Sequence, residues 1–136
     1  MFEIFPHTAD VGLRVQAADP TELFVEAARG FSTLLVDNLD DVASSESVGF
    51  TVHGTELDYL LFDWLHELLF TFEIRHLVFS RFEVALHADG LRATAHGEKL
   101  DFARHRVNHE VKAVTYHGFT VEEAAEGWVA EVIFDI

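Results

Sequence analysis

Two segments of this 136-residue sequence have the apolar spacing of helices, and most of the remainder alternates with the two-residue period of strands. Asp19, Pro20 and Glu22 predict the start of the first helix, because they supply an N-cap, a proline at the first helical position and a capping-box partner. Thr55 with Asp58 predicts the start of the second helix, which spans about 18 residues. The expected buried face of the first helix consists of Leu23, Ala27, Phe31, Leu34 and Leu35.

The order of these elements indicates the fold class. Strands are expected at residues 2–5, 11–17, 47–53, 78–87, 91–97, 111–116, 119–123 and 128–134. Asp89-Gly90 predicts a tight hairpin, whereas residues 37–47 and 100–108 have the composition of loops. Strands that first alternate with two helices and then follow one another through tight turns predict an α+β fold, with two helices packed on a largely antiparallel or mixed β-sheet. We expect residues 1–136 to form a single compact domain.

The charge balance argues against several classes of function. The chain has 24 Asp and Glu against 9 Lys and Arg, a formal charge of −15, which repels phosphate backbones and anionic lipid head groups. Extensive direct binding of nucleic acid is therefore not expected. Because the sequence has no Cys, a metal ion would need oxygen or imidazole ligands. With no signal-peptide pattern and no apolar run long enough to span a bilayer, we expect a soluble cytoplasmic protein that does not bind membranes.

Local motifs of catalysis are scarce. Gly97-Glu98-Lys99 lacks the preceding glycine of a phosphate-binding loop, and the sequence has neither a GxSxG elbow nor an HExxH helix. His105 and His109 have helical spacing but lie in a predicted loop, so we expect two solvated histidines rather than a metal site.

The second predicted helix carries aromatic residues on both of its sides. Its leucines and Trp64 fill one broad apolar face, whereas Tyr59 and Phe70 lie on the polar side, with Phe62 nearby. In small domains, such rings are more commonly covered by another segment of the same chain. The alternative is that the rings form an interface with a partner.

Carboxylates are present at both ends of the chain. The sequence finishes in Asp135 and Ile136, which places a side-chain carboxylate beside the terminal one. If Asp10 lies beside them, three anions converge, and a hard cation such as calcium or magnesium would relieve their repulsion. Spacing alone favours the alternative, in which the termini are solvated and frayed.

Lys112 lies close to the one basic cluster of the sequence, which contains Arg104, His105, Arg106 and His109. A solvated lysine on a strand is the simpler interpretation. The other interpretation is that Lys112 binds a phosphate or carboxylate of a partner.

Four ordered segments resemble the archease family, the protein cofactors of the 3′-phosphate RNA ligase that seals spliced tRNA halves. They are HTADVG at residues 7–12, LLFDWLHELL at 60–69, EVKAVTYH at 110–117 and VIFDI at 132–136. The resemblance implies a protein that is not an enzyme itself. Such a protein would promote attachment of GMP to the active-site histidine of the ligase, restore the ligase between turnovers and broaden its use of nucleotides in tRNA splicing and RNA repair.

The resemblance also implies site residues. Asp10, Asp135 and the carboxylate of Ile136 correspond to the family's metal site, for which we expect calcium, with magnesium or manganese as alternatives. Lys112 corresponds to a lysine needed for activation. Two other functions are compatible with the sequence: a chaperone or modulator of another RNA-modifying enzyme, such as a tRNA methyltransferase, and a metal-dependent hydrolase using His7 and Asp10. The hydrolase lacks a recognisable set of nucleophile and general base.

Overall fold

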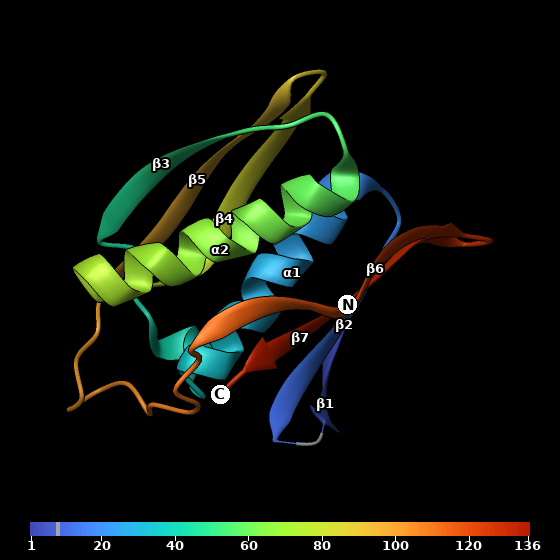
Figure 1. Ribbon diagram of the computed structural model, residues 1–136. Coiled ribbons are helices and arrows are strands. Elements are labelled where there is room, and N and C mark those ends of the chain that lie inside the picture. The colour runs from blue at the N-terminus through green and yellow to red at the C-terminus, as the bar shows by residue number, and fades with distance from the viewer. Residues whose placement is uncertain (8) are drawn as a thin grey trace.

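The strands pair into two antiparallel sheets in the computed structural model of the chain (Figure 1), which describes residues 1–7 and 9–136. One sheet has the strand order β1-β2-β7-β6 and the other the order β3-β5-β4. The elements are β1 (Phe2–His7), β2 (Asp10–Ala17), α1 (Pro20–Leu35), η1 (Leu39–Asp41), β3 (Glu46–His53), α2 (Leu57–Arg75), β4 (Leu77–His87), β5 (Gly90–Lys99), β6 (Ala113–Ala124) and β7 (Gly127–Asp135). Thr8, part of the predicted corner between the first two strands, lies outside the described residues.

Helix α1 begins where the sequence predicts. The carboxylate of Asp19 accepts a hydrogen bond of 2.8 Å from the backbone N–H of Glu22, and Pro20 is the first helical residue. The predicted apolar face is buried, from 0% exposed at Leu23 to 3% at Leu35. These local signals are sufficient because the cap and the stripe both lie within the helix itself.

Helix α2 begins differently from the prediction. Glu56 is its N-cap residue, with no side-chain hydrogen bond to the helix, so the capping role assigned to Thr55 is wrong. Asp58 instead accepts a hydrogen bond of 2.8 Å from the N–H of the next residue, Tyr59. The helix is fixed by packing: Trp64 is fully buried, and its indole Nε1–H donates to the carbonyl of Phe24 in α1 at 3.1 Å.

The two helices lie with the two sheets around one core. Helix α1 contacts β2 of one sheet and β4 of the other, while α2 packs on α1 and lies beside β6 (Figure 1). The predicted class, a single α+β domain with two helices, is confirmed, and all the strand pairs are antiparallel. Among the described residues, no helix combines the length and apolarity that crossing a membrane requires.

The loop after β5 differs from the sequence prediction because His105 is buried, at 3% exposure. Its Nδ1 accepts a hydrogen bond of 2.9 Å from the N–H of Asp101, and its Nε2 lies 3.0 Å from the carboxylate of Glu98. The same carboxylate accepts a bond of 2.7 Å from the N–H of Ala43 and pairs with Arg104. The expectation of a solvated His105 is therefore wrong, because a carboxylate from β5 satisfies its ring.

This network sets the ionisation of Glu98. The hydrogen bond from Arg104 is the largest influence; burial opposes it, and the bonds from Ala43 and His105 reinforce it, so that the pKa of Glu98 falls to about 2. Because this value lies below the ordinary 4.5, ionised Glu98 contributes stability that is fully present above pH 4.5 and is lost as the pH falls toward 2.

We predict that Glu98→Gln lowers the free energy of unfolding at pH 7 by about 1–3 kcal/mol, because the buried His105, together with Arg104 and the N–H of Ala43, loses a charged acceptor. Urea denaturation at several pH values would measure this difference, which should shrink as the pH falls below 4.5. Glu83→Gln is the matched control, since Glu83 also pairs with a histidine, His96, but is 64% exposed. Its effect on stability should be much smaller than that of Glu98→Gln. Equal losses in the two variants would contradict the role of Glu98.

Candidate functional site

Asp10 and Asp135 lie directly opposite each other on neighbouring strands. The pairing of β2 with β7 places Asp10 opposite Asp135 and Val11 opposite Phe134. Val11 is 5% exposed and Phe134 is 0% exposed, with the Phe134 ring centroid 5.5 Å from that of Phe31 in α1. Because strand residues alternate between faces, burial of this pair turns Asp10 and Asp135 toward the other face of the sheet. Directly opposite residues have Cβ atoms about 4.5–5.5 Å apart, close enough for two carboxylates to share one ligand.

The turn before Asp10 contains a strained residue. Ala9 has φ 58°, in the left-handed region, which raises the energy of a residue other than glycine by about 1–2 kcal/mol. His7 is paired with Asp10 across the hairpin, and its Nδ1 lies 3.6 Å from Asp10 Oδ2. Backbone strain of this kind persists where the surrounding structure imposes it and is concentrated at functional sites.

The last two residues are held in place. Asp135 belongs to β7, and its carbonyl accepts a hydrogen bond of 2.7 Å from the N–H of Lys112. The side chain of Ile136 is partly buried against the core. The end of the described chain is therefore packed rather than frayed, and Ile136 directly follows Asp135.

The surroundings of Asp10 and Asp135 bear on the predicted metal site. In residues 1–7 and 9–136, the carboxylates of Asp10 and Asp135 form no ion pair with Lys or Arg that would neutralise them. The same residues hold no group of three or more His, Cys, Asp or Glu side chains placed to bind a metal. The predicted site combines the side-chain carboxylates of Asp10 and Asp135 with the terminal carboxylate of Ile136, and it stays a prediction. Oxygen ligands of this kind are typical of calcium, magnesium and manganese.

Lys112 lies at the same end of the sheet as Asp135 but borders helix α2. It directly precedes β6, whose first residue, Ala113, is paired with Asp135. Lys112 is exposed and borders a groove of about 180 Å³ between α2 and the start of β6, together with His66, Phe70 and other residues. The structure thus brings the backbone of Lys112 to Asp135 while its side chain borders the α2 groove.

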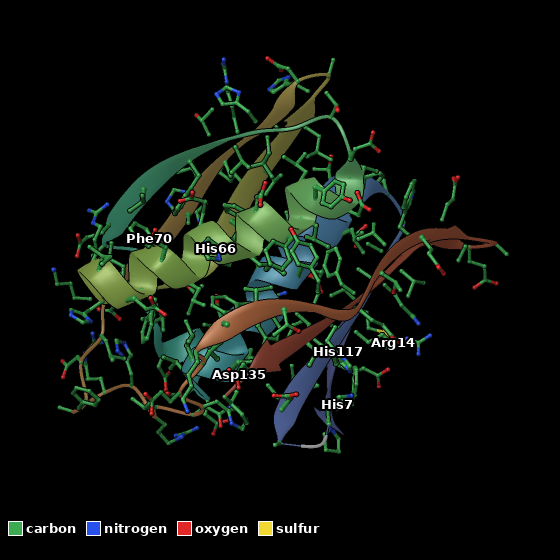
Figure 2. The ribbon with its side chains drawn as sticks, viewed as in Figure 1. His7, Arg14, His66, Phe70, His117 and Asp135 are labelled. Atoms are coloured by element: carbon green, nitrogen blue, oxygen red, sulfur yellow. The ribbon has the colours of Figure 1, made fainter. Side chains whose placement is uncertain are left out.

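Two residues near these positions were missed in the sequence. His117 of β6 lies edge-on to His7, with ring centroids 5.5 Å apart, and Figure 2 shows the two side chains on the same part of the molecule. Tyr116 stacks on Phe62 at 3.8 Å. Both residues lie in the segment EVKAVTYH, and this segment was the only indication of them in the sequence. Their contacts could not be predicted, because they involve His7 of β1 and Phe62 of α2.

The fold and site define a small α+β protein in which both ends of the chain contribute carboxylates to one pair of strands. The sequence pattern of the archease protein family (MTH1598/TM1083) matches residues 2–136. The chain is 43% identical to the protein archease of Methanopyrus kandleri over 139 residues, a match that covers 99% of each protein. It is 37% identical to the protein archease of Pyrococcus abyssi over 140 residues, covering 99% of this chain and 98% of that protein.

Solved structures agree with this relationship. The solution structure of Methanobacterium thermoautotrophicum protein 1598 has a TM-score of 0.86 and 33% sequence identity, covering 99% of this chain and 98% of that one. A crystal structure described as an archease and possible chaperone from Thermotoga maritima has a TM-score of 0.67 at 21% identity, covering 100% and 98% of the two chains, a likeness of fold alone. The chain belongs to the archease family.

We predict that Asp135→Asn, measured with a chelator present, leaves the free energy of unfolding unchanged or raises it by about 0.2–1 kcal/mol. The reason is that like charges directly opposite each other on paired strands repel. Chemical denaturation would measure the change. Glu131→Gln is the matched control on the same two strands, because Glu131 lies opposite Arg14 and is paired with it at 3.2 Å. That substitution should lower stability slightly. If Asp135→Asn were clearly destabilising, the carboxylate would serve the fold rather than a ligand.

Proposed function

We propose that this chain is a non-catalytic activator of the tRNA-splicing 3′-phosphate RNA ligase. It promotes attachment of GMP to the active-site histidine of the ligase, restores the ligase between turnovers and broadens its nucleotide use. Membership of the archease family supports this proposal. The observation that supports it most directly is the cross-strand pair of Asp10 and Asp135, because two directly opposed carboxylates repel each other and a bound cation would relieve that repulsion.

A divalent cation, calcium in our proposal, with magnesium or manganese as alternatives, is held by Asp10, Asp135 and the carboxylate of Ile136. When bound, such an ion supplies positive charge that can attract and orient phosphate oxygens. Asp10 and Asp135 fix the position of that charge because each belongs to a strand whose neighbouring residue, Val11 or Phe134, is buried in the core. Adding one residue after Ile136 would convert its carboxylate into an amide and remove one ligand.

Lys112 has a separate role in this proposal. Its exposed ammonium group contacts an anionic group at the active site of the ligase, such as a phosphate of the nucleotide. The hydrogen bond between its N–H and the carbonyl of Asp135 keeps it at the carboxylate end of the domain. The charge of −15 suits docking on a basic RNA-binding enzyme and leaves contact with RNA to that enzyme.

A chaperone or modulator of another RNA-modifying enzyme, such as a tRNA methyltransferase, is the second candidate. The exposed rings of Tyr59 and Phe70, at 58% and 53% exposure, favour it because chaperones bind apolar surfaces of their clients. Suppression of a partner's aggregation that is independent of Asp10 and Lys112 would support this function over ligase activation.

We predict that Asp10→Ala abolishes activation and leaves the fold intact, since Asp10 contributes little to the apolar core. The measurement is covalent guanylylation of a 3′-phosphate RNA ligase over repeated turnovers, with limiting ligase and GTP. The rate should fall to that of the ligase alone. Glu131→Gln, on the same face of the sheet, should stimulate normally. Normal stimulation by Asp10→Ala would refute the metal-site role, and circular dichroism of the variant excludes unfolding as the cause of a loss.

A further inference from the structure

Helix α2 and strand β6 together present aromatic rings to solvent. We call the set Tyr59, Phe62, Phe70, Tyr116 and Phe119 the α2–β6 aromatic surface. Tyr59, Phe70 and Tyr116 are each more than half exposed, at 58%, 53% and 57%. Figure 2 shows Phe70 and its neighbour His66 on the outward side of α2. The sequence left open whether Tyr59, Phe62 and Phe70 are covered within the chain; the structure leaves Tyr59 and Phe70 exposed, whereas Phe62 is half-buried and stacks on Tyr116.

Four of the five rings, all except Phe70, contact one another in one arrangement. Phe62 and Tyr116 are stacked, with centroids 3.8 Å apart and an angle of 7° between the planes. Phe119 lies edge-on to both, at 5.8 Å from Phe62 and 6.0 Å from Tyr116. Tyr59 lies edge-on to Tyr116 at 6.5 Å. An aromatic surface that is already ordered loses little side-chain entropy when a partner binds.

An irregularity in β6 directs two of these rings toward α2. Thr115 is paired with Ile133, and Thr120 is paired with Glu131. Residues 116–119 of β6 therefore lie opposite a single residue of β7, Val132. Bulges of this kind redirect side chains and occur next to functional sites. Here the irregular segment contains Tyr116 and Phe119, and it brings both rings against Phe62.

The charges around the surface decide which kind of partner fits. Asp58 and Asp63 belong to the same helix as Tyr59; burial, and then the charges of Asp63, Tyr59 and Asp58, raise the pKa of Tyr116. Glu67 and Glu73 are exposed on the same helix. These carboxylates repel the phosphates of RNA, and they also repel a second copy of a chain whose charge is −15. Arginine, by contrast, both stacks on aromatic rings and pairs with carboxylates.

We propose that the α2–β6 aromatic surface is a docking site for a basic segment of the RNA ligase, with an arginine over Tyr59 and Tyr116 that pairs with Asp58 and Asp63. The choice of the ligase as the partner rests on the proposed function. Apolar residues of the same segment contact Phe70 and enter the groove of about 180 Å³ that Phe62, Phe70 and Lys112 border. Docking here leaves Asp10 and Asp135, on the other face of the sheet end, free to act separately.

The test separates binding from activation. Binding of the purified ligase to the full chain is measured by calorimetry, and stimulation of guanylylation is titrated with the same proteins. Tyr59→Ala and Phe70→Ala should each weaken binding about tenfold or more, as for central aromatic residues of an interface. The concentration for half-maximal stimulation should rise in parallel, while the rate at saturation stays that of the wild type. Phe102→Ala, at a ring that is 79% exposed in another part of the molecule, is the matched control and should bind normally.

Charge reversal gives an independent test of the arginine contact. Asp63→Lys should weaken binding, and it should reduce the salt dependence of the binding that remains. Asp40→Lys makes the same change in net charge at an exposed position on η1 and should have a much smaller effect. If Asp63→Lys bound as tightly as the wild type, or more tightly, the proposed charge complementarity would be wrong.

The remaining outcomes distinguish the two proposals. Wild-type protein that binds the ligase through these residues but does not stimulate it would overturn the proposed function and leave the docking site standing. Stimulation with unchanged binding in Tyr59→Ala, Phe70→Ala and Asp63→Lys would overturn the docking site alone. No binding by the wild type would overturn both proposals. Binding of single-stranded RNA that the same substitutions abolish would show instead that the rings stack on bases.

Discussion

The antiparallel pairing of β2 with β7 is the constraint on which the site depends. It joins two segments from opposite ends of the sequence, so the closing of a long loop must be offset by burial of apolar surface. Val11 and Phe134 contribute to that burial as one directly opposed pair, with Phe134 packed against Phe31 of α1. The pair of Asp10 and Asp135 is the next rung of the same ladder. The core therefore determines where the carboxylates meet, without any attraction between them.

The two-residue alternation of strands also separates the carboxylate pair from the groove beside α2. Asp10 and Asp135 lie on the face of the sheet opposite Val11 and Phe134, whereas Lys112 borders the groove next to α2. This end of the sheet thus carries the carboxylate pair on one face, and the α2–β6 aromatic surface lies on the side of the other face. Such a domain can bind a partner through one face while it presents the charged residues at its end to the partner's active site.

The sequence predicts best where the determining interactions are local. Asp19, Pro20 and Glu22 locate the start of α1 because the cap, the proline and the carboxylate all act within one turn. His105 was predicted wrongly because its partner, the carboxylate of Glu98, comes from β5 and cannot be inferred from the loop itself. Similarly, the irregular register of β6 around Tyr116 depends on packing against α2. The proximity of Asp10 to Asp135 followed from resemblance to a family, since spacing alone favoured frayed ends.

The formal charge of −15 bears on how both the carboxylate pair and the aromatic surface would act on a basic partner. A strongly acidic protein approaches a basic enzyme rapidly, because the summed field steers the encounter, but the field alone selects neither an orientation nor a site. The ordered rings of Tyr59 and Tyr116 supply the orientation through short-range contact. The carboxylates of Asp10 and Asp135 then concentrate negative charge at one end, where a divalent ion would reverse the local sign. An acidic domain can in this way present a positive group to the phosphates of a nucleotide, which its net charge would otherwise repel.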